Sequence, residues 1–441
     1  MTELLAPLLS AWDPPPVSEG ALDPLGLYPI ADRLGILLAP GVRERQSEAR
    51  YLVPICVGCV IGEELGIDEV AADGMTQPWL VYEWYIVEAL VRSRGRTKPL
   101  MGLPGREKVT TAIQHGEPVC ARTYLKTPAI FGFHGVYRTL AETLELIDSE
   151  GRLLEAGLEL VQHWEAEAGL KGFVTGLGPG RELRKMLVEA VRAGMDAART
   201  ARSPGWRGWA LLARYLDPEH LGDQTQSGIW EILCNGGEVG WRRLLLEQLV
   251  TREGQRRWEE HSERTFHTWL YRKSPQGLRM LLDAIFSYER FSRLLLDAFE
   301  EVLFEAGRQS TKMHPRQLAR FELLQRSIRK TAEAYHQVQQ DLVALEANDL
   351  LAEFTDRFQE FGRELKGEDW IELLLQHHWR IQAHKPPAGK APWLDRFDDG
   401  SFMTRPLYRR EEAPEGGDEY VHQYRTNPLD AFCRTLHRVP T

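Results

Sequence analysis

The run from 277 to 365 constrains the fold more than any other part of the chain, because apolar residues recur along it at helical spacing. The spacing predicts three helices with a break at 307–315, and these helices are expected at 278–306, 315–345 and 348–365. The face of the first helix that we expect to be buried carries Phe291, Leu294, Leu295, Ala298, Phe299, Val302 and Leu303. Helices of this length pack as a bundle or as a coiled-coil-like hairpin, so a mainly α-helical chain is expected.

The length of 441 residues allows two or three domains. Four parts are expected along the chain: an N-terminal helical region with an extended arm at 1–104, a compact module at 105–168, a multi-helix bundle at 181–366 and a small, basic and aromatic α+β segment at 367–441. A glycine-rich stretch at 169–180 separates the module from the bundle. It lacks the Gly-Lys-Ser/Thr ending of a phosphate-binding loop, so we interpret it as a linker.

The five cysteines are an odd number without a regular framework, which indicates a reducing compartment. Cys56 and Cys59 have the spacing of a metal pair, but they lie in an apolar run and no second pair follows. They are therefore expected in the core, and no metal site or cofactor is expected. The first residues lack a positive region and no run approaches ~18 apolar residues. We therefore expect a cytoplasmic protein without a membrane partner.

The formal net charge of −10 excludes a general polyanion binder, so any nucleic-acid binding must come from local basic patches. Within the module, Val136, Leu140, Leu144 and Ile147 recur at spacings of four, four and three, which predicts one apolar helix face. A turn at 148–151 and a short strand at 152–154 follow. A second amphipathic helix is expected from Glu155 to about Glu167, with Leu158, Val161 and Trp164 inward.

This order of helix, short hairpin and helix resembles the back half of a winged helix-turn-helix domain. The front half would be a helix at 105–114, a strand at 119–125 and a one-turn helix at 127–131, with Thr127 as N-cap and Pro128 in first position. The resemblance implies that the helix after the turn enters the major groove of DNA. The residues that it implies as nucleic-acid contacts are Arg122, Lys126, His134, Tyr137, Arg138, Thr139 and Arg152.

Asp148 and Glu150 at the tip of the expected hairpin oppose this interpretation, because they would repel a phosphate backbone. A structural or protein-docking role of the module therefore stays open. Further along the chain, basic residues could form a second patch that binds nucleic acid. The alternative is that they form a merely solvated surface. These residues are Arg181, Arg184, Lys185, Lys385, Lys390 and Arg405. In the C-terminal segment they alternate with aromatic residues, which suits a groove for a nucleic-acid strand. There we expect 402–410 to form a strand, with 420–424 as its partner.

The spacing of Arg308 and His314 resembles the arginine–histidine motif of metal-independent helical ribonucleases. That resemblance implies histidine as acid and base, and arginine as the group that stabilises phosphate charge. Two residues depart from the motif: Pro315 follows the histidine at once, and Gln309 follows the arginine. A chance spacing in a loop is the alternative. A second place for an enzymatic site is the region from 377 to 410, which contains the adjacent pair His377 and His378.

Two pairs of stretches resemble an uncharacterised bacterial protein family that occurs among phage-defence genes: 22–27 with 43–51, and 385–393 with 405–408. The resemblance implies an accessory component of a bacterial anti-phage defence system. The leading hypothesis is a non-enzymatic protein that binds nucleic acid, with DNA favoured, and other defence-system proteins. The alternatives are a nuclease at one of the two places above and a helical interaction scaffold that binds no nucleic acid.

Overall fold

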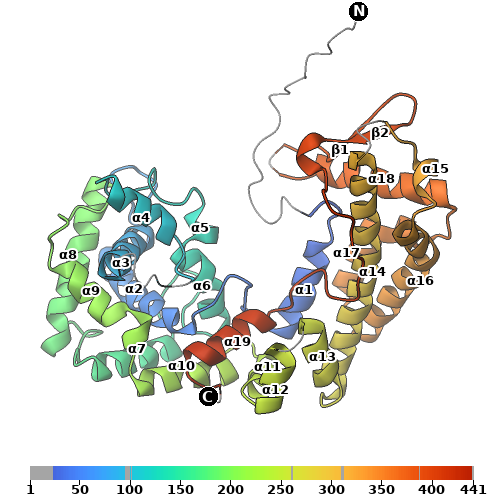
Figure 1. Ribbon diagram of the computed structural model, residues 1–441. Helices are drawn as coiled ribbons and strands as arrows, with labels where there is room; N and C mark the ends of the chain where they lie inside the picture. The colour runs from blue at the N-terminus through green and yellow to red at the C-terminus, as the bar shows by residue number, and fades with distance from the viewer. Residues whose placement is uncertain are drawn as a thin grey trace, which may run out of the picture. The chain divides into compact units, whose positions relative to one another are not determined.

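The computed structural model describes residues 23–94, 100, 102–259, 262–308, 312–386 and 388–439. The extended arm expected at the start of the chain lies outside these residues. The described residues form nineteen α-helices and a single two-stranded sheet, so the prediction of a mainly α-helical chain is confirmed (Figure 1). Each helix of the described part is too short or too polar to span a lipid bilayer.

The chain forms two compact units, and each is assembled from segments that are distant in sequence. Unit 1 comprises Met1–Leu34 and His261–Tyr424, and unit 2 comprises Gly35–Glu260 and Arg425–Thr441. The four predicted parts do not coincide with these units. Both ends of the predicted module fall inside unit 2, and the predicted boundary at 366/367 falls inside unit 1. Glycine-rich and charged stretches mark turns in the sequence, whereas the units are set by the packing of distant helices.

Unit 1 is built around the long helix α14 (Gln276–Arg308), which packs along α16 (Glu322–Ala344). The two helices are antiparallel, since Arg290 lies opposite Glu333 and the hydroxyl of Ser327 donates to the carbonyl of Leu294. The other helical elements of the unit are α13 (Glu263–Tyr271), α15 (Pro315–Leu318), α17 (Asn348–Phe358), η5 (Gln359–Gly362), α18 (Gly367–Ala383) and η6 (Pro406–Tyr408). The helix predicted at 278–306 is confirmed. The helix predicted at 315–345 is interrupted at 319–321, between α15 and α16, and the one predicted at 348–365 ends as an α-helix at Phe358.

The predicted buried face of α14 is confirmed as well, because each of its seven apolar residues is at most 2% exposed. Aromatic rings from three helices meet at its centre: Phe291 of α14 contacts Tyr335 of α16 and both Phe354 and Phe358 of α17. Each such ring buries a large apolar area, which accounts for the close packing of α14, α16 and α17. One face of the α14–α16 pair is thus fixed in the core, and the opposite side is free to form a surface.

The sheet of unit 1 joins β1 (Leu394–Arg396) to β2 (Phe402–Thr404) in antiparallel register, with Leu394 opposite Thr404. A strand is therefore present within the predicted 402–410 segment, but the pairing predicted with 420–424 is wrong. A short turn lets β1 and β2 meet at little entropic cost. Val421 and its neighbours instead donate to the side chain of Glu289.

Unit 2 is built around α3 (Pro78–Arg94), which contacts α2 (Leu52–Leu65), α4 (Arg106–Gln114), α8 (Arg181–Ala197) and α9 (Gly208–Leu216) (Figure 1). Cys56 and Cys59 lie buried in α2 as expected. Further helical elements of this unit are η2 (Ala49–Tyr51), η3 (Gly178–Gly180), η4 (Pro218–His220), α10 (Asp223–Asn235), α11 (Arg242–Leu249), α12 (Arg252–Glu259) and α19 (Thr426–Thr435). Helix α1 (Tyr28–Leu38) contains the first division between the units, at Leu34.

Within the predicted module, helices occur where the sequence indicated them. They are α4, α5 (Pro128–Phe131), α6 (Phe133–Thr143) and α7 (Glu155–Glu167). The hairpin between α6 and α7 is reduced to one antiparallel bridge, Ile147 to Leu153. The strand predicted at 119–125 is wrong, because those residues form turns. The helices match the expected order, while the sheet of a wing amounts to a single bridge.

Candidate functional site

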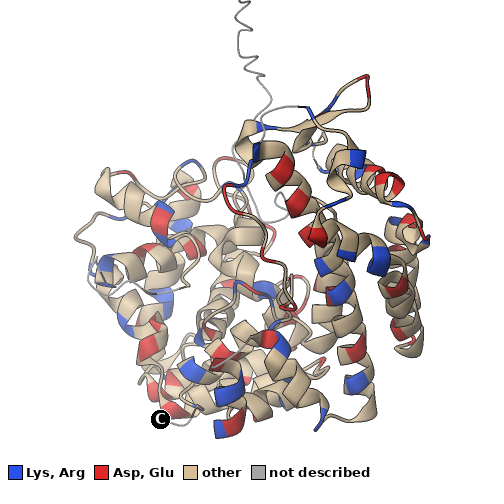
Figure 2. Ribbon diagram, turned by 45° about the vertical axis from the view of Figure 1, so that its right-hand side comes forward, with Lys and Arg blue, Asp and Glu red and all other residues tan. Residues whose placement is uncertain are grey.

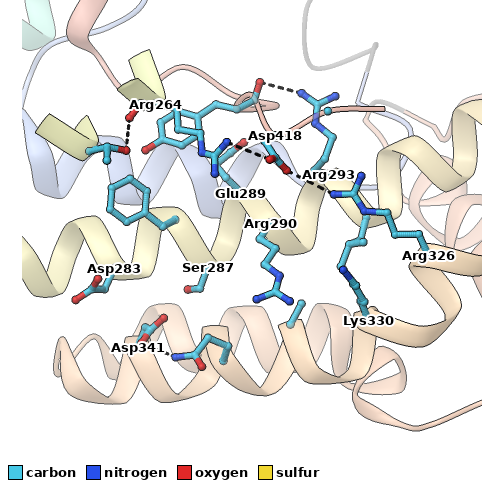
Figure 3. A pocket seen from close by; sticks show the side chains of 17 residues that line it. Arg264, Asp283, Ser287, Glu289, Arg290, Arg293, Arg326, Lys330, Asp341 and Asp418 are labelled. Atoms are coloured by element: carbon cyan, nitrogen blue, oxygen red, sulfur yellow. Dashed lines mark hydrogen bonds and ion pairs between the residues drawn. The ribbon is translucent and has the colours of Figure 1, made fainter. Parts of the chain in front are cut away.

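A groove of about 810 Å³ lies in unit 1 between α13, α14, α16 and the segment around Asp418 (Figure 3). Charged side chains line most of it. The basic ones are Arg264, Arg290, Arg293, Arg326 and Lys330, and the acidic ones are Asp283, Glu289, Asp341 and Asp418. Basic and acidic residues are interspersed over the helices of the whole chain (Figure 2). Five basic residues against four acidic ones give the groove a formal excess of one positive charge in a chain with a net charge of −10.

Helical spacing and the antiparallel packing place the basic residues together. Arg290 and Arg293 are three residues apart on α14, and Arg326 and Lys330 are four apart on α16, so each pair shares a helix face. Figure 3 shows Arg326 and Lys330 toward one end of the groove, with Arg290 between them and Asp283. The groove is therefore polarised, with cations concentrated at one end.

The guanidinium groups at this end differ in how firmly they are paired. Arg293 donates to the backbone carbonyls of Glu419 and Tyr420, at 2.9 and 3.1 Å, and so fixes the groove's edge. Arg290 is 49% exposed and lies 3.3 Å from Glu333, which is itself 69% exposed. Among the described residues no acidic side chain lies within ion-pair distance of Lys330. Lys330 and Arg290 are therefore the cations most available to a ligand, because exposed ion pairs are weak.

Asp418 bridges α13 and α16, two of the helices that flank the groove. Its carboxylate lies 3.8 Å from the guanidinium of Arg264 and 3.6 Å from that of Arg326 (Figure 3). The side chain of Asp418 is 74% exposed. A single carboxylate therefore lies between two arginines that line the groove.

The opposite end of the groove is acidic. Asp283 accepts a hydrogen bond from the hydroxyl of Tyr271, and burial raises the pKa of Asp283 above its ordinary value. Asp341 accepts from the amide of Gln337 at 3.0 Å. Carboxylates accept hydrogen bonds from amino and hydroxyl groups, so this end suits the neutral, donor-bearing part of a ligand.

A buried polar network supports the back of the groove. The carboxylate of Glu289 is 3% exposed and accepts from Nδ1 of His422 and from the hydroxyl of Tyr424, both at 2.7 Å, as well as from the backbone of Val421. Burial raises the pKa of Tyr424, so this hydroxyl stays protonated as a donor. Because buried polar groups that lose a partner are costly, the network fixes the position of the 420–424 segment.

Two aromatic rings line the same groove. Phe286 and Tyr420 have their ring centroids 6.4 Å apart, and both side chains are partly exposed. Tyr420 lies within hydrogen-bonding distance of Nδ1 of His267, at 3.2 Å. Burial lowers the pKa of His267 to about 3, so His267 is neutral at physiological pH. The rings offer flat apolar surfaces beside the cations, as in grooves that bind single-stranded nucleic acid.

The predicted recognition helix is largely covered. All eleven residues of α6 are buried or only partly exposed, because the helix packs against both α2 and α3. Tyr137 is fully buried, and its hydroxyl accepts from the backbone N–H groups of Ser47 and Glu48 at 3.2 Å. The outward position predicted for Tyr137 is therefore wrong. Thr139 is partly buried, and its carbonyl accepts from the hydroxyl of Thr143.

His134 and Arg138 on the same helix are also engaged within unit 2. The ring of His134 stacks on Trp79 with the centroids 4.8 Å apart, and burial lowers the pKa of His134 to about 3. The guanidinium of Arg138 pairs with Glu142 at 2.7 Å and donates to the carbonyl of Ser149. Neither side chain is free to read a base edge without first losing these contacts.

The other predicted contacts of the module lie on its surface. Arg122 is 78% exposed and lies 3.9 Å from Glu117, and Lys126 is exposed. Arg152 is 57% exposed and pairs with Glu150 at the turn. The acidic turn thus neutralises the cation beside it.

The second basic patch is divided between the units. Arg181, Arg184 and Lys185 belong to α8 in unit 2, whereas Lys385, Lys390 and Arg405 belong to unit 1. They therefore do not form one patch within either unit. Several are already paired, as Arg184 with Glu64 at 2.6 Å and Arg405 with Asp395 at 2.8 Å. The Nζ of Lys385 donates to the carbonyl of Asp23, and burial lowers the pKa of Lys385 to about 8.

The two candidate nuclease sites show no assembled catalytic geometry within the described residues. Arg308 is 60% exposed and lies 3.4 Å from Glu305, while the backbone N–H of His314 donates to Gln317 at the start of α15. Gln309 itself lies outside the described residues.

The adjacent histidines of α18 are structural instead. His377 and His378 bond to the carbonyls of Leu25 and Pro24, both at 2.8 Å. Burial lowers the pKa of His377 to about 4 and that of His378 to about 3. Both rings are therefore neutral and committed to backbone partners, which leaves neither of them to act as an acid or a base.

The groove of unit 1 was not predicted from the sequence, although a signal was present. Arg290 with Arg293, and Arg326 with Lys330, repeat at helical spacing on two helices separated by a break. Folding those helices into an antiparallel hairpin would have brought the four cations onto one surface.

Neither a family model nor a curated protein nor a solved structure matches this chain at a significant level. The winged-helix and phage-defence resemblances therefore stay predictions.

Proposed function

We propose that this protein is a non-enzymatic nucleic-acid-binding protein that holds a single strand in the groove between α14 and α16. The observation that carries the proposal is the convergence of Arg290, Arg326 and Lys330 on one groove, beside the rings of Phe286 and Tyr420. Cations follow the phosphates of a strand and aromatic rings stack on its bases, with little dependence on sequence.

The size and charge of the groove agree with this ligand. Its volume of about 810 Å³ lies within the range of specific ligand sites and suits a few nucleotides of one strand. The acidic end at Asp283 and Asp341 would accept from base amino groups or from sugar hydroxyls. The same end would repel the second phosphate backbone of a duplex, so a single strand is favoured over double-stranded DNA.

The resemblance to proteins found among phage-defence genes supports a role as an accessory component that acts with partner proteins. In such a role the protein would hold a strand while a separate component acts on it.

The experiment is fluorescence anisotropy with labelled single-stranded DNA, single-stranded RNA and duplex DNA of about 12 nucleotides, within the usual site sizes. The double variant R290A/K330A is expected to bind the preferred single strand roughly tenfold or more weakly than the wild type, because charged hydrogen bonds are lost. The matched control is R214A/R243A, which removes two exposed cations from unit 2. Equal binding by all three proteins, or an equal loss in the control, would overturn the proposal. Comparison of the DNA and RNA arms identifies the ligand.

A further inference from the structure

The segment 411–419, which we call the acidic strap, passes beside the basic end of the groove. It reads Glu-Glu-Ala-Pro-Glu-Gly-Gly-Asp-Glu, and all five of its carboxylate side chains are exposed. Like charges this close together repel one another, and neighbouring cations offset part of that repulsion. The cations that the structure provides are the pair Arg264 and Arg326, which Asp418 bridges.

The strap is anchored on both sides of Asp418. On one side, Gly416 is packed so closely against Leu323 of α16 that an added Cβ would lie 2.7 Å from that side chain. On the other side, Arg293 holds the carbonyls of Glu419 and Tyr420. The backbone at Asp418 is therefore fixed at the groove, and only the side chain has to rotate for the carboxylate to leave the arginines.

The carboxylate itself is held weakly. Its distances of 3.8 and 3.6 Å to the two guanidinium groups exceed the roughly 2.8 Å of a direct charged hydrogen bond, and the side chain is 74% exposed. Exposed pairs of this kind contribute little to stability and are screened by salt. A backbone phosphodiester carries the same single negative charge as the carboxylate, and its strand makes further contacts with the cations of the groove. It can therefore displace the weakly held carboxylate from Arg264 and Arg326.

We propose that the acidic strap is a built-in competitor of the nucleic acid, in which Asp418 occupies a phosphate subsite formed by Arg264 and Arg326. This inference rests on the proposed function, because it assigns a regulator to the same groove. Binding of a strand then requires exchange of Asp418 for a phosphate. While Asp418 occupies this subsite, the protein binds a strand with lower affinity.

The test compares D418N with E419Q by anisotropy, using a fluorescein-labelled oligothymidine of about 12 nucleotides. The two substitutions each remove one exposed negative charge from the same strap. Only Asp418 pairs with the groove arginines, whereas Arg293 contacts Glu419 through its backbone carbonyl. We expect D418N to raise the affinity about three- to tenfold, and E419Q to change it less than about twofold.

A double-mutant cycle tests whether the gain in affinity comes from the release of the groove arginines. In the background of R326A, the gain from D418N is expected to shrink, because one of the two cations released by the substitution is gone. An unchanged or lower affinity of D418N would overturn the inference, since it would mean that Asp418 orders the arginines rather than competes for them. An equal gain in E419Q would overturn it too, as a general charge effect. A failure of the proposed function would be seen in a different measurement, because R290A/K330A would then bind the strand as tightly as the wild type.

Discussion

The carboxylate of Glu83 on α3 accepts a 2.6 Å hydrogen bond from the hydroxyl of Tyr124, 41 residues later in the chain. The same carboxylate accepts from the backbone N–H groups of Phe133 and His134, at 3.0 and 2.7 Å, in the first turn of α6. The N-cap residue of α6, Gly132, has no side chain to fill this role. Glu83 therefore caps a helix from a distant part of the chain and ties α3 to α6.

The titration of Glu83 is expected to make unit 2 less stable as pH rises. Burial raises the pKa of Glu83 from 4.5 to about 7. Between these values the folded protein holds a proton that the unfolded chain has released, so the free energy of unfolding falls with rising pH. The contribution is complete below about pH 4.5, is lost by about pH 7, and is on the order of 3 kcal/mol. Urea unfolding of the wild type and E83Q at a series of pH values measures it. Parallel pH profiles of the two proteins would contradict this prediction.

Gly132 is expected to tolerate no side chain. A Cβ at this position would lie 2.4 Å from Oε1 of Glu83 and 2.5 Å from the carbonyl of Pro128. We expect G132A to lower the free energy of unfolding by about 1–3 kcal/mol, the usual effect of overpacking. The control is G62A in α2, where an added Cβ meets nothing within 4 Å. There alanine should stabilise the helix by up to about 1 kcal/mol. A thermal melt in which G132A matches the wild type would show that the cap can move aside.

Arg242 is expected to be a strong structural residue of unit 2. It is fully buried and donates to the carbonyls of Pro40, Leu233, Gly236 and Glu238, and burial lowers its pKa to about 10. Replacement by methionine leaves buried carbonyls without donors, so R242M should cost about 3 kcal/mol or more. The neighbouring Arg243 is 57% exposed, and R243M should change the stability by less than about 0.5 kcal/mol. Similar unfolding midpoints for the two variants would refute the assignment.

Periodicity was a sufficient guide to the helices but not to their partners. Val136 and Leu140 repeat at helical spacing and are buried, and α7 begins and ends at the predicted residues. Tyr137 lies between them in sequence, on what would be the polar side of a helix with one buried face. It is buried because α6 packs against two helices and because the backbone at Ser47 binds its hydroxyl. A contact across 90 residues leaves no trace in local spacing.

The same limit explains why the groove was missed. Arg290 and Lys330 are 40 positions apart, and their common surface exists only once α14 and α16 pack against each other. The strand pairing failed for a related reason. Phe402 pairs with Arg396 across a short turn, while Tyr424 is held by Glu289 on α14. The short turn favours the pairing of β1 with β2, and the buried carboxylate of Glu289 holds the 420–424 segment elsewhere.

The salt dependence of single-strand binding tests the central proposal most directly. Three phosphate contacts, by Arg290, Arg326 and Lys330, should give a slope of log affinity against log salt of about −2, and loss of two contacts in R290A/K330A should reduce it to about −0.7. The control R214A/R243A should keep the slope of the wild type. A slope that is the same in the groove variant and the wild type would contradict the account, because the strand would then be held elsewhere on the chain.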